Sequence, residues 1–235
     1  AENKSMQTLI VGATSSIGLA TTRAFVAAGH RVMATSRQRS PRPSGLPVTW
    51  SDLDLLDVKS IESFAESSVP AFGPLDAVVV LAGVLPGQQL ADYSDEELDW
   101  VMTVNFSGPA RVIRALLPHL SDAAHIVMTS SISGLRGSFD PIYAASKAAL
   151  IGFTKSLATS LAPKTRVNTI TPGLVKDSTM YHAMLPERRN QHALENPTGR
   201  LVTLEEVAEL LVQLTGRAWS NTTGRVISIG DTPND

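Results

Sequence analysis

The sequence predicts an α/β protein with a doubly wound parallel sheet of about seven strands and helices on both faces. Apolar runs of strand length alternate with helical patterns along the chain, as is typical of parallel sheets. Hydrophobic residues make up 43% of the 235 residues and charged residues 18%, so the chain can bury a sizeable core. We expect one domain over residues 1–235, because α/β folds of this length commonly form a single domain.

The expected elements follow one another in a regular order. Gly29 and His30 end the first helix, and a loop rich in basic residues and proline covers residues 37–47. Strands are expected at 7–11, 31–36, 48–53, 75–81, 124–130, 166–170 and 225–229, and helices at 19–28, 58–68, 95–117, 143–161 and 204–214, with an irregularity at Gly108-Pro109. Binding sites gather at the carboxyl ends of such strands, near which lie Gly12, Arg37, Asp54, Gly83, Ser131 and Pro172.

A glycine turn joins the first strand to its helix. Gly12 and Gly18 enclose residues 13–17. Gly12 permits a tight turn, and Gly18 lets helix and strand pack closely. Free backbone N–H groups and the helix dipole make such a turn a candidate pyrophosphate site. Many strand-to-helix turns carry two glycines, so the turn alone is a weak indication.

A tyrosine and a lysine stand four positions apart at the start of a later helix. The spacing of Tyr143 and Lys147 places both side chains on one helical face. A free phenol has a pKa of about 10, and an ammonium beside it favours the phenolate. Such a pair can move a proton to or from a carbonyl or alcohol oxygen. Spacing alone favours the alternative, a helix-start tyrosine with a solvated lysine.

Together these features resemble the short-chain dehydrogenase/reductase family, over nearly the whole chain and in the family's order. Asn105 lies between the glycine turn and Ser131, which precedes Tyr143 by twelve residues. Segments 168–173 and 223–230 resemble the family's segment beside the nicotinamide and its final strand. The resemblance implies a Rossmann fold, a nicotinamide dinucleotide, and a small-molecule carbonyl or alcohol substrate.

The resemblance also implies a role for each site residue. Ser131 would orient the substrate oxygen, Tyr143 would give it a proton, and Lys147 would lower the pKa of Tyr143 and hold the ribose hydroxyls. Asn105 would anchor a water on the proton path. The implied catalytic residues are Asn105, Ser131, Tyr143 and Lys147. The implied substrate-binding residues are Ser131, Ser133, Tyr143, Met180 and Met184, the last two on a lid at about 176–200. The implied cofactor-binding residues are Gly12, Thr14, Ser15, Ser16, Ile17, Gly18, Ser36, Arg37, Asp54, Leu55, Ala82, Gly83, Tyr143, Lys147, Pro172, Gly173 and Val175.

Several positions depart from the family's pattern. Ser16 stands where a glycine is usual, which narrows the freedom of the backbone. Val80-Leu81 replace two asparagines that brace the sheet in the family. Asp177 replaces a threonine that contacts the nicotinamide carboxamide, and Ser178 and Thr179 are the candidates to take over that contact.

The end of the second strand favours NADP(H) over NAD(H). NAD sites usually carry an acid there for the ribose 2′-hydroxyl, but this strand ends in Ser36-Arg37. Arg37 could pair with a 2′-phosphate and Ser36 could donate a hydrogen bond to it. Arg39 is a second candidate, and a solvated basic loop is the alternative. Asp54 resembles the residue that accepts from the adenine amine; its alternative is a helix cap, for which Asp57 is better placed.

Charge and composition argue against several other classes. A net charge of −2 leaves no footprint for nucleic acid. No apolar run approaches the roughly 20 residues of a membrane span. Without cysteine or paired histidines at ligand spacing, we expect no metal site. No signal peptide is recognisable, so we expect a cytoplasmic protein.

Assembly into a homodimer or homotetramer is expected through the helix that carries Tyr143. Small residues there, Ala144, Ala148, Ala149 and Gly152, could let two copies pack closely across a two-fold axis. Relatives in the family commonly assemble in this way. The alternative is that these residues face the sheet.

Three function classes are compatible with these features. An NADP(H)-dependent carbonyl reductase or alcohol dehydrogenase accounts for the most residues. A dinucleotide-binding regulatory or scaffold protein on the same fold gains support from Ser16 and Val80-Leu81. A non-redox lyase similar to the halohydrin dehalogenases is disfavoured, because that group has arginine in place of Lys147 and a blocked glycine turn.

Overall fold

The computed structural model describes residues 5–230, and seven parallel strands form its sheet in the order β3-β2-β1-β4-β5-β6-β7. The strands are β1 (Gln7–Val11), β2 (Arg31–Ser36), β3 (Thr49–Asp52), β4 (Leu75–Val80), β5 (Leu120–Thr129), β6 (Thr165–Pro172) and β7 (Val226–Ile229). The order reverses between β1 and β4, which is the place where ligands bind in open parallel sheets. The predicted doubly wound α/β fold is confirmed.

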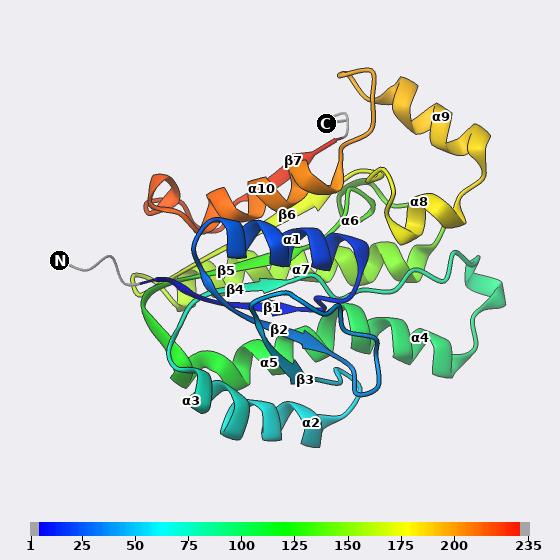
Figure 1. Cartoon of the computed structure of the whole chain (residues 1–235). Helices are drawn as coiled ribbons and strands as arrows, with labels where there is room; N and C mark the ends of the chain where they lie inside the picture. Colours follow the sequence, from blue (N-terminus) through cyan, green and yellow to red (C-terminus); the bar gives the residue numbers. More distant parts are fainter. Residues whose placement is uncertain (1–4, 231–235) are drawn as a thin grey trace.

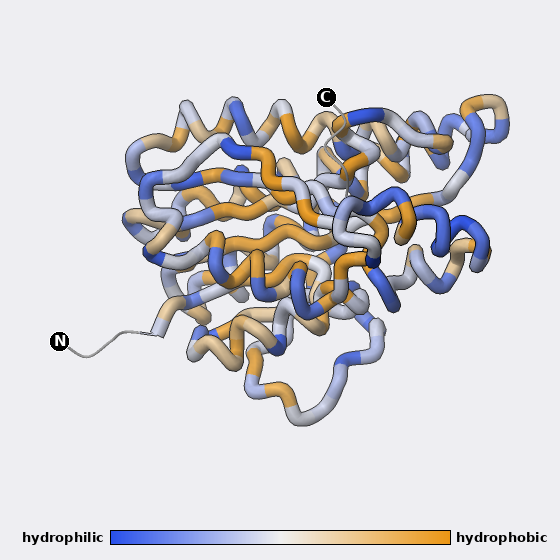
Figure 2. The backbone as a smooth tube through the Cα atoms, turned by 90° about the horizontal axis from the view of Figure 1, so that it is seen from above, coloured by the Kyte–Doolittle hydropathy of each residue, from blue (hydrophilic) through white to orange (hydrophobic). Residues whose placement is uncertain are grey.

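Helices cover both faces of the sheet (Figure 1). On one face lie α1 (Ser16–Ala27) and α10 (Leu204–Thr215); on the other lie α2 (Val58–Ser63), α3 (Val69–Phe72), α4 (Asp95–Met102), α5 (Gly108–Leu116) and α7 (Pro141–Ser160). Strand residues alternate between the two layers: Leu9 and Val11 join the cluster under α5, whereas Ile10 joins the cluster under α10. Because helices cover both faces of the sheet, side chains pointing to either face are buried, and the strands are apolar along nearly their whole length. Figure 2 shows these apolar strands at the centre of the molecule.

Two of the expected helices are interrupted by π-helical turns, at Phe64–Ser68 and Thr103–Ser107. The second turn ends directly before α5, next to the irregularity expected at Gly108-Pro109. Strand boundaries also differ from expectation: β5 begins at Leu120 rather than at residue 124, and β3 is shorter than 48–53. Helix α7 begins at Pro141, because Asp140 caps it by accepting a hydrogen bond from the Tyr143 N–H.

The segment expected as a lid leaves the sheet and returns to it. Val175 and Val202 form a parallel bridge, and the Lys176 N–H donates to the Val202 carbonyl at 2.8 Å. Between them lie α8 (Thr179–Ala183) and α9 (Pro186–Glu195). Figure 1 places both helices at the end of the molecule where the strands finish, together with the start of α4.

On α7, Ala148 and Gly152 are exposed while Ala144 is buried, so part of the small-residue face is open to solvent. Among residues 5–230, no helix combines the length and the apolar character that crossing a bilayer requires.

A buried histidine makes the stability of the sheet dependent on pH. His125 on β5 is fully buried with its Nε2 2.8 Å from Asn168 Nδ2, and burial first, then Arg166, lowers its pKa from 6.5 to about 3. Between these two values the unfolded chain binds a proton that the folded chain does not. Stability is therefore retained above pH 6.5 and lost as the pH falls towards 3.

We expect the unfolding free energy, measured by urea titration, to fall more steeply over this pH window in the wild type than in His125→Asn. The exposed His182 provides the matched control, and His182→Asn should keep the wild-type slope. Equal slopes in the wild type and in His125→Asn would contradict the assignment.

Candidate active site

The glycine turn closes tightly between β1 and α1. Gly12 has φ +84°, and a Cβ built on it would lie 2.8 Å from the Ala82 nitrogen. A Cβ on Gly18 would lie 2.3 Å from the Gly12 carbonyl oxygen, so neither position has room for a side chain. The Ser15 hydroxyl caps α1 by accepting from the Gly18 N–H at 3.0 Å. The remaining N–H groups of the first turn have no acceptor within the helix.

Ser16 of this turn faces helix α8. Ser16 Oγ lies 3.5 Å from Thr179 Oγ1 at the start of α8. Thr14 and Ile17 are partly buried in the same turn. The turn and the lid therefore meet in space although they are far apart in the sequence.

Ser131, Tyr143 and Lys147 are brought together behind the carboxyl end of β5. Each is buried, with 8%, 6% and 5% of its surface exposed. The Lys147 ammonium lies 5.8 Å from the centre of the Tyr143 ring and donates to the Thr129 carbonyl at 3.1 Å. That is the one hydrogen bond that the structure gives this ammonium among the described residues. The Ser131 hydroxyl accepts from the Ser133 N–H at 3.1 Å.

Burial dominates the electrostatics of this group. Burial raises the pKa of the Tyr143 phenol above its ordinary 10.0, the Ser131 hydroxyl opposes the rise, and the charge of Asp140 adds to it. Burial also lowers the pKa of Lys147 from 10.5 to about 8. The net direction for Tyr143 is thus set by burial, and the expected lowering of its pKa by Lys147 stays a prediction. A phenol with a raised pKa is a proton donor at neutral pH.

Asn105 fastens the segment after β4 to α7. Its Oδ1 accepts from the Val84 N–H at 2.8 Å, and its Nδ2 donates to the Val84 carbonyl and to Ser146 Oγ, both at 2.9 Å. Asn105 is fully buried within the π-helical turn. Both ends of its side-chain amide are thus occupied by protein groups. Gly83, just before Val84, is exposed, and a Cβ there would lie 3.0 Å from Lys147 Nζ.

An open cavity of about 740 Å³ lies beyond the ends of β2 and β3. Arg37, Arg39 and Asp54 line it, and their part in a cofactor site stays a prediction. Asp57 caps α2 by accepting from the Lys59 N–H at 2.9 Å. Leu55 does not line the cavity, since its side chain is buried in the core beneath α5.

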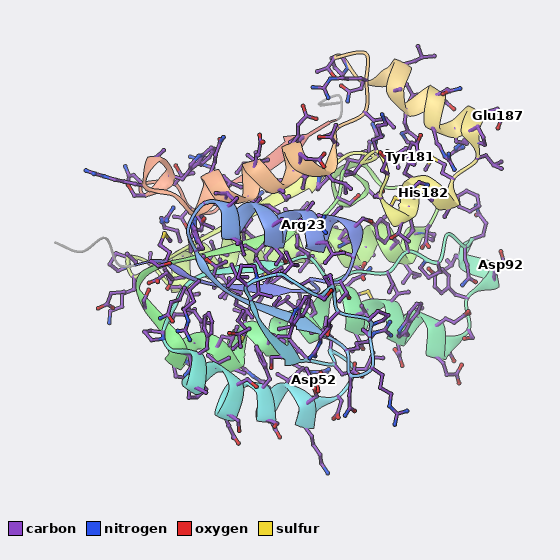
Figure 3. All side chains as sticks on the ribbon, viewed as in Figure 1. Arg23, Asp52, Asp92, Tyr181, His182 and Glu187 are labelled. Carbon is purple, nitrogen blue, oxygen red and sulfur yellow. The ribbon has the colours of Figure 1, made fainter. Side chains whose placement is uncertain are left out.

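Sequence reasoning missed Arg42. Its Nε donates to Ser36 Oγ at 2.9 Å, and its Nη2 pairs with Asp52 Oδ1. The guanidinium lies 5.6 Å from the Trp50 ring. Figure 3 shows Asp52 at the margin of the sheet beside α2. In the sequence, Arg42 is only one of several arginines in a basic loop. That pattern does not show which of them contacts Ser36 at the end of β2.

The other predicted residues lie at the same end of the sheet. Pro172 ends β6, and its carbonyl accepts from the Ile132 N–H at 3.2 Å. The Gly173 N–H donates to the Ile229 carbonyl at 2.9 Å, and Val175 and Ala82 follow β6 and β4. Met180 and Met184 are half-buried at α8, and Ser133 begins the short helix α6 (Ser133–Arg136).

Apolar side chains are exposed at the end of the molecule where the strands finish. Three segments contribute them: the loop after β4, the stretch from α6 to α7, and the lid. The exposed side chains are Leu85 (38%), Leu90 (60%), Leu135 (53%), Phe139 (62%) and Leu185 (68%); we call these five the apolar rim. The lid's Arg189 is held inside the lid, where it donates to the Met184 and His182 carbonyls and stacks on Tyr181. Figure 3 shows Tyr181 and His182 on α8, above the start of α7. Among residues 5–230, no cluster of metal-ligating side chains is found.

Comparisons with known proteins identify the family. Residues 12–230 match the family model described as Enoyl-(Acyl carrier protein) reductase. The chain is 35% identical to 3-oxoacyl-[acyl-carrier-protein] reductase FabG of Thermotoga maritima over 234 residues, covering 94% of each chain. A short-chain dehydrogenase/reductase from Brucella melitensis superposes with a TM-score of 0.88 at 26% identity, covering 95% of this chain and 94% of that one. A variant of actinorhodin polyketide ketoreductase with NADPH gives a TM-score of 0.87 at 28% identity, covering 97% of each. The chain therefore belongs to the short-chain dehydrogenase/reductase family of nicotinamide-dependent oxidoreductases.

Proposed function

We propose that this protein is an NADP(H)-dependent oxidoreductase that interconverts a ketone or aldehyde and an alcohol, with Tyr143 as the acid and base. The observation that carries the proposal is the convergence of Ser131, Tyr143 and Lys147 in one buried group. The relatives named as 3-oxoacyl reductase and polyketide ketoreductase support carbonyl chemistry. None of the relatives named above is described as a scaffold or regulatory protein.

The residues present fit a nicotinamide dinucleotide. The tight turn at Gly12 and Gly18 leaves backbone N–H groups for a pyrophosphate. The buried Lys147 ammonium has three N–H donors and one protein acceptor, so two donors remain for ribose hydroxyls. The proposed cofactor residues are those named from the resemblance, with Arg42 added and with Leu55 acting only through its backbone.

In the proposed reaction each residue of the buried group has one task. The bound cofactor supplies or accepts the hydride. Ser131 orients the substrate oxygen, and the Tyr143 phenol donates its proton to that oxygen during reduction. The raised pKa of Tyr143 keeps the phenol protonated at neutral pH, which suits the reductive direction. Asn105 keeps the strand-end loop in place, and a water on the proton path stays a prediction.

The preference for NADP(H) rests on two arginines. Arg37 lines the open cavity, and Arg42 neutralises Asp52, the carboxylate at the end of β3. An unpaired Asp52 would repel a 2′-phosphate. We therefore propose that Arg37 and Arg42 together admit the phosphate, with Ser36 between them.

Arg42→Ala is expected to weaken NADPH binding by roughly 10–100-fold, the range of a lost hydrogen bond between charged groups. NADH binding should change little or improve, because Asp52 becomes free to accept from a ribose 2′-hydroxyl. Arg37→Ala should weaken NADPH without improving NADH. Fluorescence titration of both nucleotides measures these changes.

Arg23→Ala is the matched control, since Arg23 is an exposed arginine on α1 (Figure 3) and its loss changes the net charge equally. It should bind both nucleotides as the wild type does. An unchanged NADPH to NADH ratio in Arg42→Ala and Arg37→Ala would contradict the NADP(H) assignment. Binding of neither nucleotide by the wild type would contradict the cofactor site itself.

The apolar rim suggests the kind of substrate. Exposed apolar side chains around a pocket commonly mark the place where an apolar ligand body rests. We propose a ketone or aldehyde whose reacting carbon carries an apolar chain or ring. A single domain with a lid over 176–200, a homodimer or homotetramer built on α7, and a cytoplasmic location stay predictions.

A further inference from the structure

Asp140 is a buried carboxylate with an unusual number of hydrogen-bond donors. Only 2% of it is exposed. Its Oδ1 accepts from the Tyr143 N–H at 2.9 Å, and its Oδ2 accepts from the Gly87 N–H at 2.9 Å and the Gln88 N–H at 3.3 Å. The Tyr93 phenol donates to the same carboxylate, 2.8 Å from Oδ2 and 2.9 Å from Oδ1. None of the ion pairs recorded for residues 5–230 includes Asp140.

Capping alone does not require this arrangement. A helix cap needs one acceptor for an N–H of the first turn, and serine, threonine or asparagine serve as well as aspartate. A buried carboxylate without a cation carries a desolvation penalty that only several hydrogen bonds can offset. Three of the four donors of Asp140 come from the loop Gly87–Tyr93 rather than from α7. The carboxylate therefore joins two separate segments.

Both joined segments border the reacting centre. Tyr143 follows Asp140 by three residues in the first turn of α7. The loop Gly87–Tyr93 follows β4 and carries Leu90 of the apolar rim, and Leu85 lies just before it. A change in either segment would shift the phenol relative to the substrate.

Resting on the proposed function, we propose that Asp140 is a positioning residue, which ties the loop Gly87–Tyr93 to the first turn of α7 and so fixes both Tyr143 and one side of the substrate pocket. The geometry of four donors on one buried carboxylate carries this proposal. The role is distinct from that of Ser131, Tyr143 and Lys147, since the Asp140 carboxylate is fully occupied by protein donors.

The charge of Asp140 also acts on the phenol. The charged groups beside Tyr143 are Asp140 before it and Lys147 on the same helix. On the loop, Tyr93 contacts Asp140, and Glu97 of α4 acts on Tyr93. Asp140 raises the pKa of Tyr143. Removal of this charge should lower that pKa, so the phenolate that alcohol oxidation requires should form at a lower pH.

Asp140→Asn tests the proposal because it keeps the cap and the size but loses the charge. Its Nδ2 cannot accept from Gly87 and Gln88. We expect the KM for ketone to rise by about tenfold or more, with the affinity for NADPH unchanged. The pH midpoint for alcohol oxidation should fall. Asp140→Ser, which also caps helices well, should raise KM in the same way, and Tyr93→Phe should give a smaller rise without moving the midpoint.

The control variant is Asp99→Asn, an exposed carboxylate on α4 that should behave as the wild type. Amide hydrogen exchange supplies a readout that does not depend on activity: Gly87 and Gln88 should exchange at least about tenfold faster in Asp140→Asn. Unchanged KM, midpoint and exchange, with only a lower melting temperature, would reduce Asp140 to a helix cap. A wild type without reductase activity would overturn the proposed function but leave the exchange test to decide the tether.

Discussion

Tyr143→Phe is expected to lower kcat/KM for ketone reduction by roughly 10²–10⁴-fold, the usual contribution of a general acid. The substitution removes only the phenolic O–H, and the buried ring keeps its packing. Because the ring still lies beside the Lys147 ammonium, binding of NADPH should change little. Steady-state kinetics together with a nucleotide titration separate the two effects.

Tyr181→Phe provides the control, since it removes a phenol from the lid at a partly exposed position. It should retain nearly all of the wild-type kcat. A Tyr143→Phe variant that keeps more than about a tenth of the wild-type rate would fall short of the range for a general acid and would exclude Tyr143 as the proton donor.

Lys147→Met is expected to lower the reductase activity without lowering the stability of the fold. Methionine has a similar length but no ammonium, so reduction should fall by roughly 10²-fold or more and NADPH should bind more weakly. Stability near neutral pH should be maintained or increased. The pKa of Lys147, lowered to about 8 by burial, means that the folded chain holds this ammonium at a cost. That cost is at most about 3–4 kcal/mol, because the shift from 10.5 to about 8 corresponds to about 1.4 kcal/mol per pKa unit.

The lowered pKa of Lys147 also makes the unfolding free energy depend on pH. Between pH 8 and 10.5 the unfolded chain binds a proton that the folded chain has lost, so the wild type gains stability as the pH rises through this window. Lys147→Met should lack this gain. Lys155→Met is the matched control on the same helix, because Lys155 is exposed. Urea unfolding at pH 7, 8, 9 and 10 measures the difference, and a Lys147→Met protein that is less stable than the wild type at pH 7 would contradict the buried-charge argument.

Strand positions could be predicted well from the sequence, because buried parallel strands are short apolar runs bounded by turn residues. The strand boundaries could not be predicted as well. Strand β5 already starts at Leu120, where the Ser121 hydroxyl donates to Asp76 on β4, and no local sequence pattern encodes that contact. The π-helical turns were also beyond prediction. A window of helical periodicity cannot detect a single extra residue in a turn.

For the candidate site, the sequence indicated residue types but not their partners. Tyr143, Lys147 and Ser131 could be found by spacing and resemblance. Arg42 could not be distinguished from other arginines of its loop, because its selection depends on Asp52 from the neighbouring strand. Asp140 was missed since an aspartate before a proline at a helix start has the pattern of an ordinary cap, whereas its other donors lie about fifty residues away.

The π-helical turn at Thr103–Ser107 makes the length of this stretch matter more than its composition. Each residue added to a helix rotates everything that follows by about 100°. The extra residue lets α4 and α5 remain one continuous rod while Asn105 faces Val84 and the apolar side of α5 still faces the sheet. Loss of any one residue would close the turn into a regular helix. Asn105 could then no longer face Val84 while the apolar side of α5 faces the sheet. A point change at the half-exposed Thr103 can be absorbed locally, but the number of residues between α4 and α5 is part of the site itself.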